Sequence, residues 1–379
     1  MASDAPTLFT SLTISGLTLK NRVLMSPMTR DRATPELVPT DFGAETSMAL
    51  YYTQRSSAGL IVTEATQVGD DGQGYPLTPG VYTTEQIAGW KTITDAVHEK
   101  GSLMFCQIWN CGRVSHTSYQ PGGRAPPAPS VVTLTEGECF TMEGPKAKTV
   151  YFPPWSTPRE ITVEEIKGYV EQFRQGALNC MKAGFDGVEI HAANGYLIDQ
   201  FLKSNTNKRN DDYGGSLENK FRFLKEVIEA CSEAIGSSKV AVHLTPGGSF
   251  NGAKDDAEEA TSNHEYYIKQ LDGMGLAYLH IKLSDDQDER HGGKIVPMEL
   301  IRTWYNGTLV ANNRFNEQED YGESGLGKHY DAIAFGRAYV ANPDLPARIA
   351  KKAELSTWDH TSFFGGSAKG YTDYPAMAE

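Results

Sequence analysis

Three polar side chains gather in the stretch EIHAANGYLIDQFL, residues 189–202. His191, Asn194 and Tyr196 follow an apolar run, and Gly195 separates the asparagine from the tyrosine. Histidine and tyrosine can transfer protons, and all three side chains can hydrogen-bond a substrate. Polar groups at the end of a buried strand form either a site or a packing arrangement, and the elements around them decide between the two.

Eight apolar runs, rich in Val, Ile and Leu, are the elements that would position these side chains. Most of them lack a clean alternation of apolar and polar residues, as expected of parallel strands that are buried on both faces. The runs are RVLMSP (22–27), GLIVTEAT (59–66), SLMFCQIW (102–109), GFDGVEIHAA (184–193), KVAVHLTP (239–246), LAYLHIKLS (276–284), GTLVANN (307–313) and YDAIAFGR (330–337).

Helical patterns separate several of these runs, at 85–101, 162–184 and 216–236, whereas 314–329 is a poor helix. Thr162 and Glu165 predict a capping box at the start of the second helix. Strands that alternate with helices predict an α/β protein, a (β/α)8 TIM barrel formed by one domain over residues 1–379. SLTI and LTLK around Ser15 and Gly16 predict an N-terminal β-hairpin. Long loops at 110–160, 247–261 and 284–297 are expected at the C-terminal face, where such barrels carry their active sites.

Polar residues stand at the end of every predicted barrel strand. In one barrel they would converge on a single basin, which a large polar ligand would require. The loops after the last two strands are the usual phosphate site of such barrels, and here Gly336 and Arg337, near a helix at Pro343, would suit a phosphate group. The strand-end residues are Thr29, Thr66, Gln107, Trp109, His191, Asn194, His243, Lys282, Asn312, Asn313 and Arg337.

Composition excludes several classes of function. The formal net charge of −13 argues against a nucleic-acid partner, and no apolar run is long enough to span a membrane. The five cysteines form no C-x-x-C pattern and are expected to be reduced. No targeting signal is visible, so a cytoplasmic location is expected. His191 and His243 lack carboxylates at ligand spacing, so no metal site is predicted.

Collinear motifs along nearly the whole chain resemble the Old Yellow Enzyme family of flavin-dependent ene-reductases. They are SPMTR, GYPLTPGVYTTEQ, QIWNCGR, HAANGYLIDQFL with NKRNDDYGGSLEN, FGRAYVANPDLPARI and GYTDYP. The resemblance implies an FMN-dependent NAD(P)H oxidoreductase that reduces the C=C bond of enones and enals, with bound FMN and NADPH as the reductant. Members of the family occur as monomers and homodimers, and either state is expected here.

The resemblance also implies roles for individual residues. Tyr196 would protonate the substrate α-carbon after hydride from flavin N5 reaches the β-carbon, while His191 and Asn194 hold the carbonyl oxygen. Thr29 would hydrogen-bond the flavin near O4, Ala65 and Gln107 would touch the ring, and Arg337 with Gly336 and Asn313 would bind the phosphate. Pro27, Met28, His243 and Asn312 complete the expected cofactor site. Tyr75, Trp109, Phe250 and Tyr371 would shape the substrate pocket.

One departure from the family lies in VHLTP, where His243 replaces the usual arginine. That arginine is expected to face the N1–O2 edge of the flavin, which is negative in the reduced state. Histidine is shorter and only partly protonated near neutral pH. We therefore predict weaker FMN binding or a lower reduction potential, and better FMN retention in His243→Arg.

Two alternatives stay open at the level of sequence. One is a flavin- or phenol-binding barrel whose reductase activity is impaired, with His243 as the cause. The other is a flavin-free barrel lyase or isomerase that forms an imine on Lys282, which ends the sixth strand. The complete set of His191, Asn194 and Tyr196 argues against the first.

Overall fold

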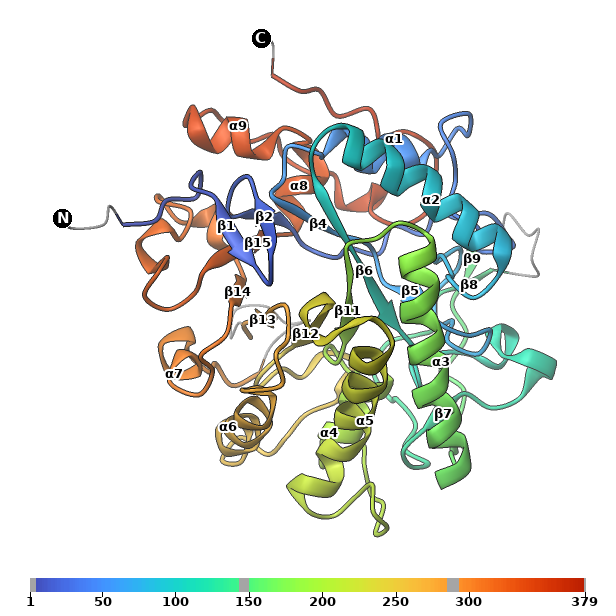
Figure 1. Cartoon of the computed structure of the whole chain (residues 1–379). Coiled ribbons are helices and arrows are strands. Elements are labelled where there is room, and N and C mark those ends of the chain that lie inside the picture. The colour runs from blue at the N-terminus through green and yellow to red at the C-terminus, as the bar shows by residue number, and fades with distance from the viewer. Residues whose placement is uncertain (1–4, 143–149, 285–292, 378–379) are drawn as a thin grey trace.

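The computed structural model describes residues 5–142, 150–284 and 293–377, and its centre is a closed ring of eight parallel strands (Figure 1). Each strand lies within one of the eight apolar runs, so the predicted TIM barrel is confirmed. In ring order the strands are β3 (Val23–Met25), β4 (Leu60–Val62), β6 (Leu103–Trp109), β11 (Gly187–His191), β12 (Val240–Leu244), β13 (Leu279–Lys282), β14 (Leu309–Asn312) and β15 (Ala332–Phe335), which pairs again with β3.

Strand register decides which side chains meet inside the barrel. His243 on β12 pairs with His280 on β13, and Lys282 pairs with Asn312 on β14. Residues two apart on a strand point to the same side. Lys282 therefore points to the same side of the sheet as His280, one layer closer to the C-terminal end of the barrel.

Helices surround the strand ring in Figure 1. The capping box predicted at Thr162 and Glu165 is present, and a second one joins Thr83 and Gln86. Residues 314–329 contain only short 3-10 turns, at Phe315–Glu317 and Glu323–Gly325. The α-helices are α1 (Met48–Gln54), α2 (Thr84–Glu99), α3 (Val163–Lys182), α4 (Leu197–Leu202), α5 (Leu217–Ile235), α6 (Ala260–Leu271), α7 (Met298–Arg302), α8 (Arg337–Ala341) and α9 (Leu345–Ala350).

The predicted N-terminal hairpin is present and packs against the barrel interior. Strands β1 (Leu12–Ile14) and β2 (Leu17–Leu19) are antiparallel. Ile14 and Leu19 are buried in one apolar cluster with Leu24, Phe105 and Tyr278. The hairpin thus covers apolar residues that lie toward the N-terminal ends of the barrel strands, which leaves the C-terminal end for a site.

The C-terminal face carries the long loops. The described part of residues 110–160 contains two short sheets, β7 (Pro127–Ala128) with β10 (Arg159–Glu160) and β8 (Thr141–Met142) with β9 (Val150–Tyr151). After β4, the short strand β5 (Thr66–Gln67) extends the sheet beside β6. Most of the predicted loop at 284–297 lies outside the described residues. All five cysteines are free and buried, and no helix in the described ranges is long and apolar enough to cross a bilayer.

Candidate active site

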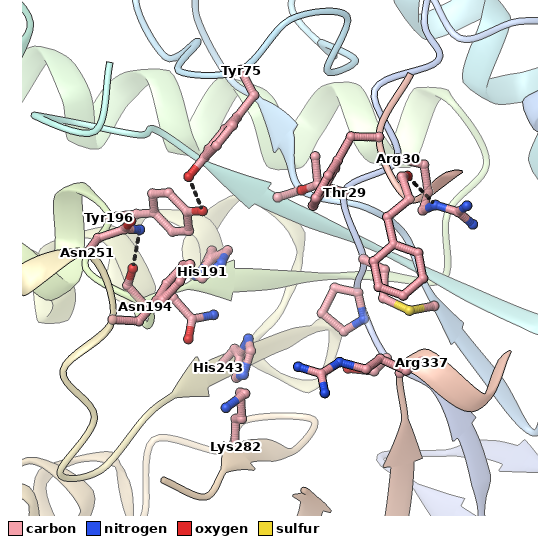
Figure 2. A pocket seen from close by; sticks show the side chains of 18 of the residues that line it. Thr29, Arg30, Tyr75, His191, Asn194, Tyr196, His243, Asn251, Lys282 and Arg337 are labelled. Atoms are coloured by element: carbon pink, nitrogen blue, oxygen red, sulfur yellow. Dashed lines mark hydrogen bonds between the residues drawn. The ribbon is translucent and has the colours of Figure 1, made fainter. Parts of the chain in front are cut away.

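A cavity of about 880 Å³ opens where the barrel strands end (Figure 2). This volume is within the range of pockets that hold small molecules and cofactors. Every residue to which the family resemblance assigns a role lines the cavity except Tyr371: Pro27, Met28, Thr29, Ala65, Tyr75, Gln107, Trp109, His191, Asn194, Tyr196, His243, Phe250, Asn312, Asn313, Gly336 and Arg337.

The turn after β11 presents the candidate catalytic side chains. Asn194 and Gly195 both have positive φ, 57° and 76°, so the chain reverses sharply between His191 and α4. The Asn194 amide donates to Thr245 Oγ1 at 3.0 Å, and Asn251 Nδ2 donates to the Asn194 carbonyl at 2.9 Å. These contacts tie the backbone of the turn to the loop after β12.

Tyr196 stands among aromatic side chains. Its hydroxyl lies 3.0 Å from the Tyr75 hydroxyl, and its ring packs edge-on against Trp109 with centroids 4.7 Å apart. Burial raises the pKa of Tyr196 well above its usual value, with the nearby Tyr75 as a second cause. The phenol therefore keeps its proton at neutral pH and can donate it.

His191 is a neutral side chain on the same wall. Burial, followed by the effect of His280, lowers its pKa to about 3. Its ring stacks on Trp109 at 5.9 Å, with 17° between the planes. A neutral imidazole can still donate one hydrogen bond.

Several buried polar atoms on the cavity wall have no hydrogen-bond partner among the described residues. They are His191 Nδ1, Asn194 Oδ1, Trp109 Nε1 and His243 Nε2. Buried polar groups are rarely left unsatisfied, because each costs about 1–3 kcal/mol. Four of them around one cavity fit a large ligand with several polar atoms, as the isoalloxazine ring of FMN with a substrate would be.

Beneath this wall lies a hydrogen-bonded network centred on Glu189. Gln107 Nε2 donates to Glu189 Oε1 at 2.8 Å and lies 3.1 Å from His243 Nδ1, and His280 Nδ1 lies 3.0 Å from Glu189 Oε2. Because the Gln107 amide donates, His243 Nδ1 accepts and Nε2 carries the proton. Burial, with the charges of His280, His191 and Lys282, holds the pKa of His243 well below its usual value. His243 is therefore neutral.

This network corrects one sequence-based interpretation. His243 and His280 each have a carboxylate neighbour, Glu189. The three residues lie on adjacent barrel strands, so their spacing in the sequence does not reveal that they are close. These three side chains are close enough to hold a metal ion. Their ring nitrogens and carboxylate oxygens already contact one another and Gln107, so we assign these side chains a structural role. The absence of a metal ion stays a prediction.

The opposite rim carries the residues predicted for the phosphate group. Gly336 is the N-cap residue of α8, and a Cβ added there would lie 3.7 Å from Met28 Sδ, an ordinary contact. Packing against neighbouring side chains therefore does not require glycine at this position. Arg337 is exposed on the rim. Since α8 is a single short turn, the Arg337 side chain rather than the helix dipole would supply the charge.

Two predicted residues lie away from the cavity. Thr66 is buried and donates to the Glu64 carbonyl at 3.0 Å. Tyr371 is buried and stacks on Tyr51 with centroids 4.2 Å apart, and the Arg32 guanidinium lies 4.3 Å from its ring centre. The structure therefore does not place Tyr371 in the substrate pocket, because these stacking and cation–π contacts hold its ring in the core.

Sequence reasoning missed Asn251 and an aromatic rim. Phe140 and Phe152 stack at 5.5 Å, and both line the cavity together with Trp155 and Phe364. Trp155 Nε1 donates to the Glu136 carbonyl at 2.9 Å. These residues come from loops without periodicity, and only their aromatic character could have suggested a role in substrate contact.

Comparison with known proteins gives a consistent result. Residues 7–356 match the NADH:flavin oxidoreductase / NADH oxidase family. A probable flavin mononucleotide-dependent alkene reductase of Leishmania infantum is 39% identical over 368 residues, which is 97% of this chain and 96% of the relative. Morphinone reductase in complex with tetrahydroNAD has a TM-score of 0.89 and 42% identity over 98% of both chains. The Old Yellow Enzyme homologue of Zymomonas mobilis has a TM-score of 0.89 and 36% identity, over 98% of this chain and 100% of that one.

Proposed function

The chain belongs to the Old Yellow Enzyme group of the NADH:flavin oxidoreductase / NADH oxidase family, and we propose that it is an FMN-dependent NADPH oxidoreductase that reduces the C=C bond of α,β-unsaturated carbonyl compounds. The observation that carries the proposal is the convergence of His191, Asn194 and Tyr196 on one cavity of cofactor size. Enones and enals are the proposed substrates, and a cytoplasmic monomer or homodimer is the expected form.

FMN, when bound, would supply the redox chemistry of the reaction, in which hydride goes from the reduced nicotinamide to flavin N5 and from there to the substrate β-carbon. The residues that would touch the flavin are the strand-end groups opposite the catalytic turn. Thr29 and Gln107 offer hydrogen bonds to the ring, and Arg337 with Gly336 and Asn313 would hold the phosphate. The full proposed set is Pro27, Met28, Thr29, Ala65, Gln107, His243, Asn312, Asn313, Gly336 and Arg337.

His191 and Asn194 would hold the substrate carbonyl oxygen. Hydride addition at the β-carbon moves negative charge to that oxygen, and two donors fixed toward it stabilise the charge as an oxyanion hole does. The low pKa of His191 means that it acts as a neutral donor. Two hydrogen bonds made by the Asn194 backbone hold the turn from which its side chain projects.

Tyr196 would complete the reaction by giving its proton to the α-carbon. Its raised pKa keeps the proton in place until carbanion character develops at that carbon. The Tyr75 hydroxyl can hydrogen-bond the tyrosinate that results. Positioned general acids of this kind contribute about 10²- to 10⁴-fold in rate. Tyr75, Trp109 and Phe250 would shape the substrate pocket.

The visible spectrum of the purified protein tests this proposal. We expect a yellow protein that bleaches when NADPH is added without oxygen and regains its colour with cyclohexenone. A yellow protein that never bleaches would favour a flavin-binding protein without reductase activity. A colourless protein that cannot be reconstituted with FMN would refute the cofactor assignment, and borohydride trapping at Lys282 would then test the lyase alternative.

A further inference from the structure

Four arginine or lysine side chains line the cavity among the described residues: Arg30, Lys282, Arg314 and Arg337. Reduced FMN carries negative charge in two places, the phosphate and the N1–C2 carbonyl part of the ring. A cation near each place would bind the reduced cofactor more tightly than a neutral wall does. The question is which side chain serves the ring.

Two of the four cations are held at other parts of the cavity wall. Arg30 is buried and donates to the Phe363 carbonyl at 2.9 Å, the Gly370 carbonyl at 2.9 Å and the Tyr51 hydroxyl at 3.0 Å. Arg314 is half exposed and pairs with Glu317 at 2.8 Å. Arg337 lies on the rim beside Gly336, where the phosphate is proposed to bind.

Lys282 lies near His243, where the family resemblance places the N1–C2 part of the ring. It is the last residue of β13, points to the same side of the sheet as His280 and pairs in register with Asn312. Its charge acts on His243, since it is one of the causes that lower the pKa of that side chain. Figure 2 shows the Lys282 ammonium beside His243, at the side of the cavity that also carries Arg337.

We propose that Lys282 is the cation that faces the N1–C2 carbonyl part of bound FMN and stabilises its reduced form. His243 cannot do so as a neutral side chain, although its Nε2 proton could hydrogen-bond the ring. The positive charge that relatives are expected to carry on the fifth barrel strand is thus placed on the sixth strand here. This inference rests on the proposed function, because it requires FMN in the cavity.

The midpoint potential of bound FMN is the measurement. In Lys282→Met, reduced FMN should lose about tenfold in affinity relative to oxidised FMN, which lowers a two-electron potential by about 30 mV. Lys282→Arg should keep the potential of the wild type. Lys328→Met removes the same charge from an exposed side chain outside the cavity and should leave the potential unchanged.

A second substitution sharpens the test. His243→Arg should restore the potential in the Lys282→Met protein, because it returns a cation to the same part of the ring. In the wild type, the gain in FMN retention expected from His243→Arg should be smaller, because Lys282 already supplies the charge. Non-additivity of the two changes is what the proposal requires.

The failures can be told apart. If the wild type binds FMN but Lys282→Met keeps its potential, as Lys328→Met does, Lys282 does not face the ring and the inference is wrong. If the wild type does not bind FMN at all, the proposed function itself fails. If Lys282→Met folds poorly, Lys282→Arg provides the test. A midpoint potential that changes more in the well-folded Lys282→Arg protein than in Lys328→Met would equally overturn the inference.

Discussion

Burial decides the protonation state of the side chains on the cavity wall. It lowers the pKa of His191 and His243 and raises that of Tyr196, because the charged form of each loses solvation. All three are thereby neutral at physiological pH. These three side chains thus offer protons and hydrogen bonds without carrying charge themselves, and negative charge that forms on a substrate oxygen meets neutral donors.

The low pKa of His191 predicts how activity depends on pH. An ordinary histidine gains a proton as the pH falls through about 6.5. His191, with a pKa of about 3, stays neutral from pH 8 to pH 5, so it should cause no step in kcat/KM for the enone. A step near pH 6.5 that disappears in His191→Asn would contradict this.

Asp199 is a group beside the turn that could produce a step in that range. Asp199 accepts the Gly195 amide proton at 2.8 Å, and burial raises its pKa to about 6. A step near pH 6 that persists in His191→Asn and disappears in Asp199→Asn would therefore come from titration of Asp199, which supports the turn.

At the scale of elements, the turn between β11 and α4 is held by backbone geometry. Gly195 has a positive φ, and a Cβ there would lie 2.6 Å from the Phe250 carbonyl oxygen. Gly195→Ala should therefore lower the free energy of unfolding and slow alkene reduction, because either the turn or the Phe250 loop must move. Gly215→Ala is the matched control, since its φ is similar and its Cβ would meet nothing within 4 Å.

Urea unfolding of the two variants measures the difference. Both variants should lose about 1 kcal/mol or more of unfolding free energy because of the positive φ, and Gly195→Ala should lose more because of the contact with Phe250. Equal unfolding free energies together with normal alkene reduction in both variants would show that the close approach at Phe250 does not constrain the turn.

A buried ion pair fastens the end of α4 to the loop after β12. Lys203 Nζ lies 2.9 Å from Asp255 Oδ2, and neither side chain is exposed. Lys203→Met would leave the Asp255 carboxylate without its cation, which should cost about 3–5 kcal/mol of unfolding free energy. Lys208→Met, an exposed lysine nearby, should cost much less. Similar unfolding midpoints for the two variants would show that the pair does not stabilise the fold.

The sequence predicted the barrel strands well, because each is an apolar run buried on both faces. It did not predict α4 or β5, which are too short to show a period. It also missed the Glu189 network, since that depends on which residues of adjacent strands share a layer. Tyr371 was assigned to the pocket from a motif, whereas its ring stacks on Tyr51 in the core.

The whole molecule is a barrel with one end covered by the β1–β2 hairpin and the other end open to ligands. A cofactor held there by strand ends from around the ring should stabilise the folded state. At a hundred times its Kd, FMN should add about 2.7 kcal/mol of unfolding free energy. Thermal unfolding with and without added FMN measures this increase.

Riboflavin separates the ring from the phosphate in that measurement. It lacks the phosphate assigned to Arg337, so at equal concentration it should stabilise the apoprotein less than FMN, and Arg337→Gln should reduce the difference. Equal stabilisation by riboflavin and FMN would contradict the assignment of Arg337 to the phosphate.

The role of Tyr196 tests the account most directly, through the two half-reactions of Tyr196→Phe followed separately by stopped-flow absorbance. The account predicts that NADPH reduces the flavin at a rate close to that of the wild type. Reoxidation by cyclohexenone should slow by about 10²- to 10⁴-fold, because the α-carbon loses its positioned acid. If reoxidation by the enone keeps its wild-type rate, Tyr196 is not the proton donor and the proposed site is wrong.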